Sequence, residues 1–142
     1  MTGIERNPNV YLNIPADGLE YAVITDFEVS ADEYRENIRK YLKVYLDNTP
    51  VGTVLFNVFY RRSVVDSDCV DSMYYNIKLD ENLSPFSDEN GKPVKTVSPE
   101  SDNPFTKGYR YTIKRGIDVI GMAIVEAKKY GARVLLSVRM DD

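Results

Sequence analysis

One segment restricts the fold of this chain more than any other. Residues 51–60, VGTVLFNVFY, are apolar on both faces of an extended strand, with Asn57 as the main interruption. A strand that faces water on one side alternates apolar and polar residues, whereas a strand inside a parallel sheet is covered on both faces and is apolar throughout. We therefore predict a buried strand here, in an α/β fold built on a parallel sheet.

The amino-terminal region supplies a second strand of the predicted sheet. Residues 1–20 are rich in Asn, Pro and Gly, and they predict an irregular lead-in with room for one short edge strand. Residues 21–29, YAVITDFEV, are β-branched and aromatic. This composition is typical of a strand, so we expect the first strand of the sheet at 21–29.

A helix is predicted between these two strands. Ser30 and Glu33 have the S-x-x-E spacing of a capping box, in which each side chain binds the other residue's backbone amide. Asn48 and Pro50 are expected to end the helix. Apolar and aromatic residues at helical intervals predict one buried stripe, formed by Tyr34, Ile38, Tyr41, Leu42 and Tyr45.

The second half of the chain repeats the order of helix and strand. Residues 110–130 predict a second helix and residues 133–138, RVLLSV, a third strand. Between them, residues 66–106 hold six Asp, three Glu and four Pro with little periodicity, which predicts a long loop. The order indicates a βαβαβ parallel-strand arrangement in one domain of residues 1–142, and we find no internal repeat that divides it.

Composition removes several classes of chemistry. The chain has no histidine, which excludes Ser-His-Asp and Cys-His catalysis, and its single cysteine, Cys69, cannot form an intrachain disulfide. A net charge of −4 argues against binding nucleic acid through a broad positive field. The chain has no apolar run of membrane-spanning length and no signal-peptide pattern, and nothing indicates its compartment.

Ligands of parallel α/β folds bind beyond the carboxyl ends of the strands, which directs attention to the polar residues there. Arginine presents a planar fork of donors that suits carboxylate, phosphate or sugar hydroxyl acceptors. The same arginines could instead pair with Asp141 or Asp142 and do no more than hold the strand ends together. The candidate binding residues are Asn57, Arg61, Arg62, Arg139, Asp141 and Asp142.

Other groups of residues are weaker indications of a functional site. Asp66, Asp68 and Asp71 have a faint calcium-loop spacing but lack its glycine and its bidentate glutamate, so no metal is expected. No G-x-G-x-x-G or GK[ST] segment is present, and no cofactor is expected. Aromatic residues of the long loop could stack on a sugar ring, although such residues more often anchor a loop through buried area.

Two segments carry a family resemblance. LFNVFYRR and EAKKYGARVLLSVRMDD resemble glycoside-hydrolase-like (β/α)8-barrel proteins, whose strand pattern S-x-R-M-N-D is matched by Ser137, Arg139, Met140 and Asp142. Asp141 stands where that group usually has Asn. The resemblance implies that Arg139 and Asp142 line a sugar site. It also implies that the catalytic carboxylates lie on later strands, so that this chain alone is inactive.

These observations leave three hypotheses. First, the chain is the opening portion of a glycosidase-like barrel, because 142 residues fall short of the roughly 200–250 that a complete barrel needs; its exposed strand edge would then favour self-association. Second, it is a small α/β ligand-binding or protein-interaction domain whose acidic loop meets a partner. Third, it is an independent enzyme using Asp26, Asp141 and Arg139, which the absence of histidine disfavours. The reading frame after Asp142 would separate the first two.

Overall fold

The computed structural model describes residues 4–15, 19, 29–60, 62–99 and 104–138. Three parallel strands form the main sheet: β1 (Asn7–Ile14), β2 (Val51–Asn57) and β7 (Arg133–Ser137), in the order β1-β2-β7. The main helices are α2 (Ala31–Leu46), α3 (Pro104–Lys114) and α4 (Val119–Lys129). Two short hairpins complete the described elements: β3 (Phe59–Tyr60) with β4 (Arg62–Ser63), and β5 (Tyr75–Ile77) with β6 (Lys95–Val97).

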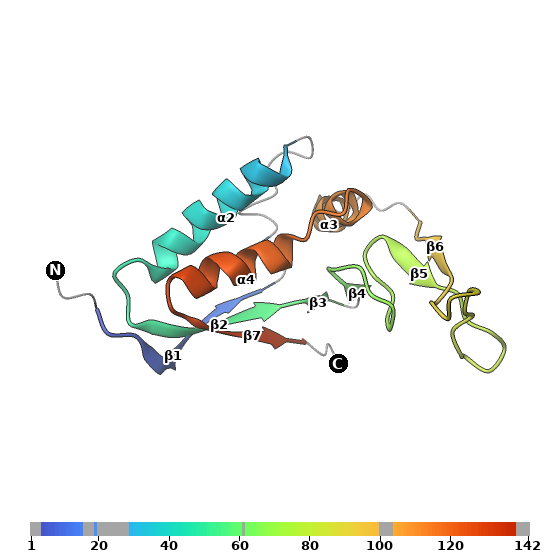
Figure 1. Cartoon of the computed structure of the whole chain (residues 1–142), viewed down its shortest axis with the longest axis horizontal. Coiled ribbons are helices and arrows are strands. Elements are labelled where there is room, and N and C mark those ends of the chain that lie inside the picture. The colour runs from blue at the N-terminus through green and yellow to red at the C-terminus, as the bar shows by residue number, and fades with distance from the viewer. Residues whose placement is uncertain (1–3, 16–18, 20–28, 61, 100–103, 139–142) are drawn as a thin grey trace.

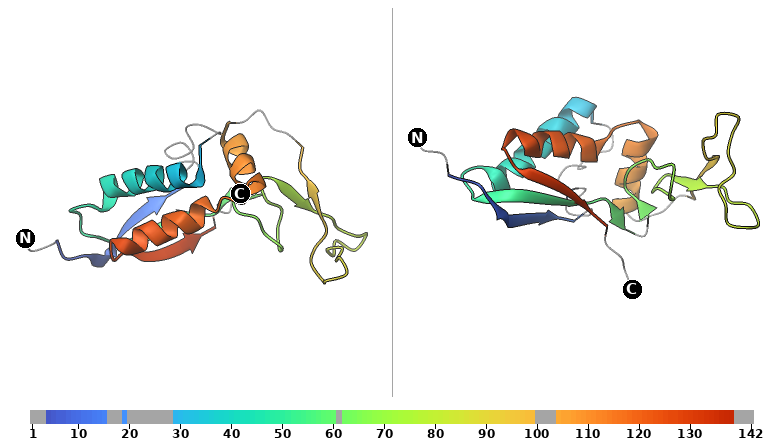
Figure 2. Two further views of the ribbon diagram at one scale, coloured as in Figure 1. Left: turned by 45° about the horizontal axis from the view of Figure 1, so that its top comes forward. Right: turned by 60° about the horizontal axis from the view of Figure 1, so that its bottom comes forward.

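The predicted mixed α/β class with a parallel sheet is confirmed. Strand β2 is central and pairs in parallel with β1 on one side and with β7 on the other. Helices α2 and α4 lie together on the same face of the sheet (Figure 1). Alternate β2 residues Val54 and Phe56 are fully buried under these helices, whereas Leu55 and Asn57 point to the opposite face and are only half-buried. No described helix lies on that opposite face (Figure 2).

The strand that opens the described sheet lies in the amino-terminal region. It occupies Asn7–Ile14, where the sequence left room for one short edge strand, and it forms the edge of the sheet as β1. Ile14 is buried and pairs with Phe56, while Tyr11 and Asn13 are exposed, so the short segment has the alternation of a strand covered on one face. Residues 21–28 of the predicted first strand lie outside the described residues.

Helix α2 begins as predicted and buries a slightly different stripe. The Glu33 amide donates to Ser30 Oγ, and the Ser30 amide donates to Glu33 Oε2 at 2.7 Å, which completes the capping box. These hydrogen bonds lower the pKa of the Glu33 carboxyl. The buried residues are Tyr34, Ile38, Leu42 and Leu46. Tyr45, predicted to be buried, is exposed and packs edge-on against half-buried Tyr41.

The helix predicted over residues 110–130 is two helices, and the glycines explain the division. Gly116 has a φ of +66°, a left-handed conformation that glycine adopts without strain, and it follows the end of α3. Asp118 then caps α4, since its Oδ1 accepts the Gly121 amide at 2.7 Å. A Cβ on Gly121 would lie 2.1 Å from Asp118 Oδ2, so glycine is what leaves room for this cap.

Most of the segment predicted to be a long loop, residues 66–106, is a folded projection, which we call the arm (residues 66–98), while residues 104–106 belong to α3. It extends past the carboxyl ends of the sheet strands (Figure 1). Three of its residues, spaced eight apart, close a ring of backbone hydrogen bonds: Lys78 donates to Val94, Val94 to Phe86, and Phe86 to Lys78. The sequences that connect them, LDENLSP and SDENGKP, are alike, so the arm contains a short internal repeat that our sequence analysis missed.

An ion-paired carboxylate lies between the two covering helices. The Glu126 side chain on α4 is only 2% exposed; it accepts from Lys129 Nζ at 2.6 Å and from Arg39 Nε on α2 at 3.4 Å. Burial alone would raise the pKa of the Glu126 carboxyl, but the hydrogen bonds from Lys129 and Arg39 outweigh it, so the pKa lies below its ordinary value of 4.5. The ionised carboxylate therefore helps hold α2 against α4.

This pair predicts a pH-dependent contribution to stability. Glu126→Gln should lower the free energy of unfolding at neutral pH by about 1–3 kcal/mol, because it removes charge-assisted hydrogen bonds. The pKa of Glu126 is lower in the folded state, so its contribution is complete above pH 4.5 and is lost as the pH falls through the folded pKa. Denaturant unfolding at several pH values measures both effects.

Glu36→Gln is the matched control for that experiment. Glu36 also contacts Arg39, at 2.7 Å, but its side chain is half exposed, and such ion pairs contribute little. If both variants lose the same stability at every pH, the ion pair between the helices is not what stabilises their packing.

Candidate functional site

The carboxyl edge of the sheet brings two polar residues together. Asn57 at the end of β2 is in register with Ser137 at the end of β7, and both are half-buried. The Val58 amide donates to the Ser137 carbonyl at 3.1 Å, which extends the pairing beyond β2. Since parallel strands place their ligand sites at this edge, Asn57 and Ser137 form the described floor of the candidate site.

The predicted binding residues have different outcomes. Asn57 lies at the sheet edge, as its position in the strand predicted. Arg61, Arg139, Asp141 and Asp142 lie outside the described residues. Arg62 is described, and its guanidinium binds other residues. Its Nη1 donates to Asn76 Oδ1 at 2.5 Å and to the Ser72 carbonyl at 3.4 Å.

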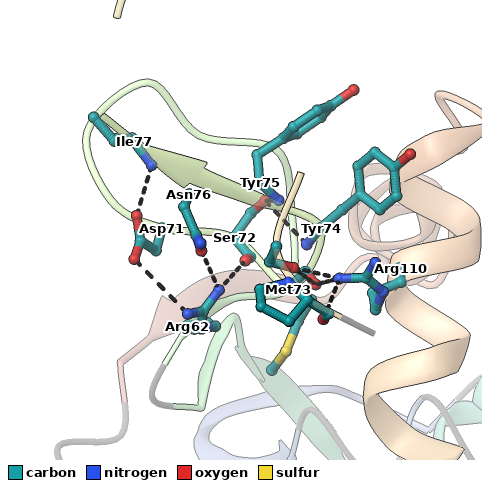
Figure 3. Close-up of polar contacts among 11 residues, drawn as sticks. Arg62, Asp71, Ser72, Met73, Tyr74, Tyr75, Asn76, Ile77 and Arg110 are labelled. Atoms are coloured by element: carbon teal, nitrogen blue, oxygen red, sulfur yellow. Dashed lines mark hydrogen bonds and ion pairs between the residues drawn. The ribbon is translucent and has the colours of Figure 1, made fainter. Parts of the chain in front are cut away.

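Arg62 therefore holds the base of the arm (Figure 3). In addition to Asn76 and Ser72, its Nη2 lies 4.0 Å from the Asp71 carboxylate. Asp71 in turn accepts the Ile77 amide at 2.7 Å and so reaches the first strand of the β5–β6 hairpin. These partners are residues of the arm that the sequence analysis did not propose for Arg62, and Asp141 and Asp142 lie outside the described residues.

Arg110 on α3 anchors the other side of the arm and was missed by sequence analysis (Figure 3). Its buried Nη1 donates to the Met73 carbonyl at 3.2 Å, to the Pro99 carbonyl at 3.1 Å and to Ser98 Oγ. Its guanidinium lies 5.1 Å from the centre of the Tyr74 ring. Nothing in the local sequence distinguished Arg110 from the other basic residues of this segment, such as Lys107 and Lys114.

Lys95 is a third cation that fixes the arm, and its partners are two residues of the calcium-like pattern. Its Nζ lies 2.8 Å from Asp66 and 2.7 Å from Asp68. Burial lowers the pKa of Lys95, but both carboxylates outweigh this effect and raise it; hydrogen bonding to Lys95 lowers the pKa of Asp68. These carboxylates neutralise a cation of the chain itself, and the described residues contain no cluster of three potential metal ligands.

An apolar cavity of about 430 Å³ lies on the helix side of the sheet, beside the carboxyl end of β7. Its wall is formed by the first turn of α4, by residues that follow β2 and by strand β7. The lining includes Val58, Ile120, Ile124 and Leu136, with Asp66 and Asp118 as its two charged residues. Asp118 is already occupied in capping α4, so this cavity suits apolar groups rather than a charged substrate.

Comparisons with known proteins do not identify the chain. No protein-family model matches it, and no curated protein matches its sequence. Among the helices that the structure describes, none is long and apolar enough to cross a membrane.

The arm anchors make a testable prediction. Arg110→Met should leave the sheet folded but loosen the arm, because three acceptors lose a charged donor. Amide hydrogen exchange within residues 66–98 should become about tenfold faster or more, with little change in β2. Lys114→Met, an exposed substitution at the end of the same helix, is the control. Unchanged exchange in the arm of Arg110→Met would contradict the anchoring role.

Proposed function

We propose that this chain is the opening portion of a glycoside-hydrolase-like (β/α)8 barrel and supplies one wall of a carbohydrate site. In this proposal the sugar lies beyond the carboxyl ends of β2 and β7. Later strands carry the acid/base and nucleophile carboxylates, so the chain alone does not hydrolyse glycosides. The observation that carries the proposal is the arrangement of the three strands.

The strand order is the one that the opening of a barrel requires. Strands β1, β2 and β7 are successive parallel strands of the main sheet and also neighbours in space, in that order. Their helices α2 and α4 lie on one face. A barrel keeps every helix outside and fills the opposite face with side chains from other strands. Half-buried Leu55 and Leu135 are suited to such an interior.

The edge at β7 also supports continuation of the sheet. Leu136 is 57% exposed and Val138 59% exposed, and the apolar cavity lies beside Leu136. Strand β7 has a hydrogen-bonded neighbour among the described strands on one side only. A further strand and helix would cover these apolar side chains and pair the open edge, as the next unit of a barrel does.

The carbohydrate part of the proposal rests on the resemblance and on the sheet edge. Ser137, Arg139, Met140 and Asp142 match the family pattern, and Ser137 lies in register with Asn57. Amide, hydroxyl and guanidinium groups are suited to the hydroxyl groups of a sugar.

Sugar binding can be tested on the chain as it is. Titration with neutral monosaccharides should shift the backbone NMR signals of Asn57 and Ser137. Arg139→Gln should weaken the binding about tenfold, as expected for loss of a charged hydrogen-bond donor. Arg62→Gln is the matched control, because Arg62 is already bound to the arm. The absence of shifts at the sheet edge, or equal effects of both variants, would contradict the site.

The open edge makes a separate prediction. Leu136→Lys should reduce self-association of the chain through β7, because a charged edge disfavours strand pairing. Sedimentation velocity at high salt, where charge attraction is screened, measures this contact. Val125→Lys changes an equally exposed valine on α4 and is the control. If the wild-type chain is monomeric at high salt and unfolds cooperatively, the exposed edge does not need a covering unit.

A further inference from the structure

We propose that the tip of the arm binds the outer face of α2 in a second copy of this chain, so that copies associate head to tail. This contact is distinct from pairing at the β7 edge and does not depend on the proposed carbohydrate site. It follows from two exposed surfaces of opposite charge, each with apolar side chains at its centre.

The arm tip exposes three large apolar side chains. Leu83 is 78% exposed, and Leu79 and Phe86 are also exposed. Phe86 is 45% exposed, and Lys78 lies over its ring at 5.1 Å. Apolar side chains exposed together on one projecting element are suited to a protein contact.

The backbone conformation of Leu83 strengthens this interpretation. The two repeat turns of the arm are built alike: the Leu83 amide donates to the Asp80 carbonyl, and the Gly91 amide donates to the Asp88 carbonyl. Gly91 has a φ of +76°, whereas Leu83 has a φ of +61°. Glycine adopts this left-handed region freely and leucine at a cost. The fold of the turn therefore favours glycine at both positions, and Leu83 adds only an exposed apolar side chain.

The charge around these apolar residues defines the partner. The tip of the arm, residues 78–94, contains four acidic residues and two lysines, a net charge of −2. At the tip, Asp80 and Asp88 accept only backbone amides. Glu81 and Glu89 form no ion pair with any described residue. A complementary surface needs exposed cations around an apolar centre.

The outer face of α2 has this composition. Val44 lies on the helix face opposite the buried Leu42 and Leu46, and it is 74% exposed. Tyr45 beside it is exposed as well. Lys40 and Lys43 flank Val44 and form no ion pair with the residues that the structure describes. We call Lys40, Lys43, Val44 and Tyr45 the α2 patch.

The positions of the two surfaces require that the contact joins different copies. The arm and the carboxyl-terminal end of α2 lie at opposite ends of the long axis (Figures 1 and 2). The arm of one copy therefore cannot reach its own α2 patch. Two antiparallel copies close a dimer when each arm meets the other copy's patch, whereas one contact between each pair of neighbours extends into an open chain. The apolar cavity is a poorer partner for the arm, because Asp66 and Asp118 would repel its carboxylates.

Leu83→Gly is the most direct test, because glycine suits the turn. The variant should retain the circular dichroism spectrum and melting temperature of the wild-type chain. Its self-association at low salt, measured by sedimentation velocity over micromolar to millimolar concentrations, should be about tenfold weaker or more, since a buried leucine side chain is lost from the contact. The wild-type association should weaken as salt is added.

Charge reversal provides a second, independent readout. We expect weaker self-association at low salt for two double variants, Glu81→Lys/Glu89→Lys and Lys40→Glu/Lys43→Glu. Mixing the two variant proteins should restore a one-to-one complex. Leu136→Lys, at the β7 edge, should leave this low-salt contact unchanged. A wild-type chain that is monomeric at low salt would overturn the proposal. So would association that survives Leu83→Gly, or that Leu136→Lys alone abolishes.

Discussion

The pairing of β2 with strands on both sides is the constraint on which the rest of the structure depends. It commits Val54 and Phe56 to the helix-covered face and turns Leu55 and Asn57 to the opposite face. The helices must then lie side by side over one face, which places Glu126 between them and explains its two cationic partners. The same pairing aligns Asn57 with Ser137, so the candidate site and the core have one common origin.

Features set by neighbouring residues could be predicted from the sequence. The capping box at Ser30 and the ends of α2 need only local hydrogen bonds, and the pattern of residues 51–60 sufficed for the central strand. The break between α3 and α4 was also encoded locally, by Gly116 and Asp118, but the apolar periodicity on either side concealed it. Strand β1 was expected only as a short edge strand, because it is covered on one face only and carries the Asn and Pro residues of an edge.

Features set by distant residues could not be predicted in the same way. The sequence alone suggested that Arg62 binds a ligand. The fold of the arm instead places Asn76 and Ser72 beside it as hydrogen-bond acceptors. Arg110 lies 37 residues from the Met73 carbonyl it binds, and nothing in its local sequence indicates that contact. Composition suggested a flexible acidic loop for the arm, whereas cations from three different segments fix its base. The repeated D-E-N turns were the one local signal of this order.

The two surfaces through which copies can meet differ in physical character, and this difference separates their roles. The β7 edge is apolar, and no described strand pairs with its outer side, so screening of charge has little influence on its association. The arm and the α2 patch combine apolar centres with opposite charges, so their association weakens as salt rises. A further βα unit would cover the first surface and leave the second open, because Val44 lies on the outer side of its helix. Head-to-tail association is therefore compatible with a completed barrel, whereas edge pairing is not.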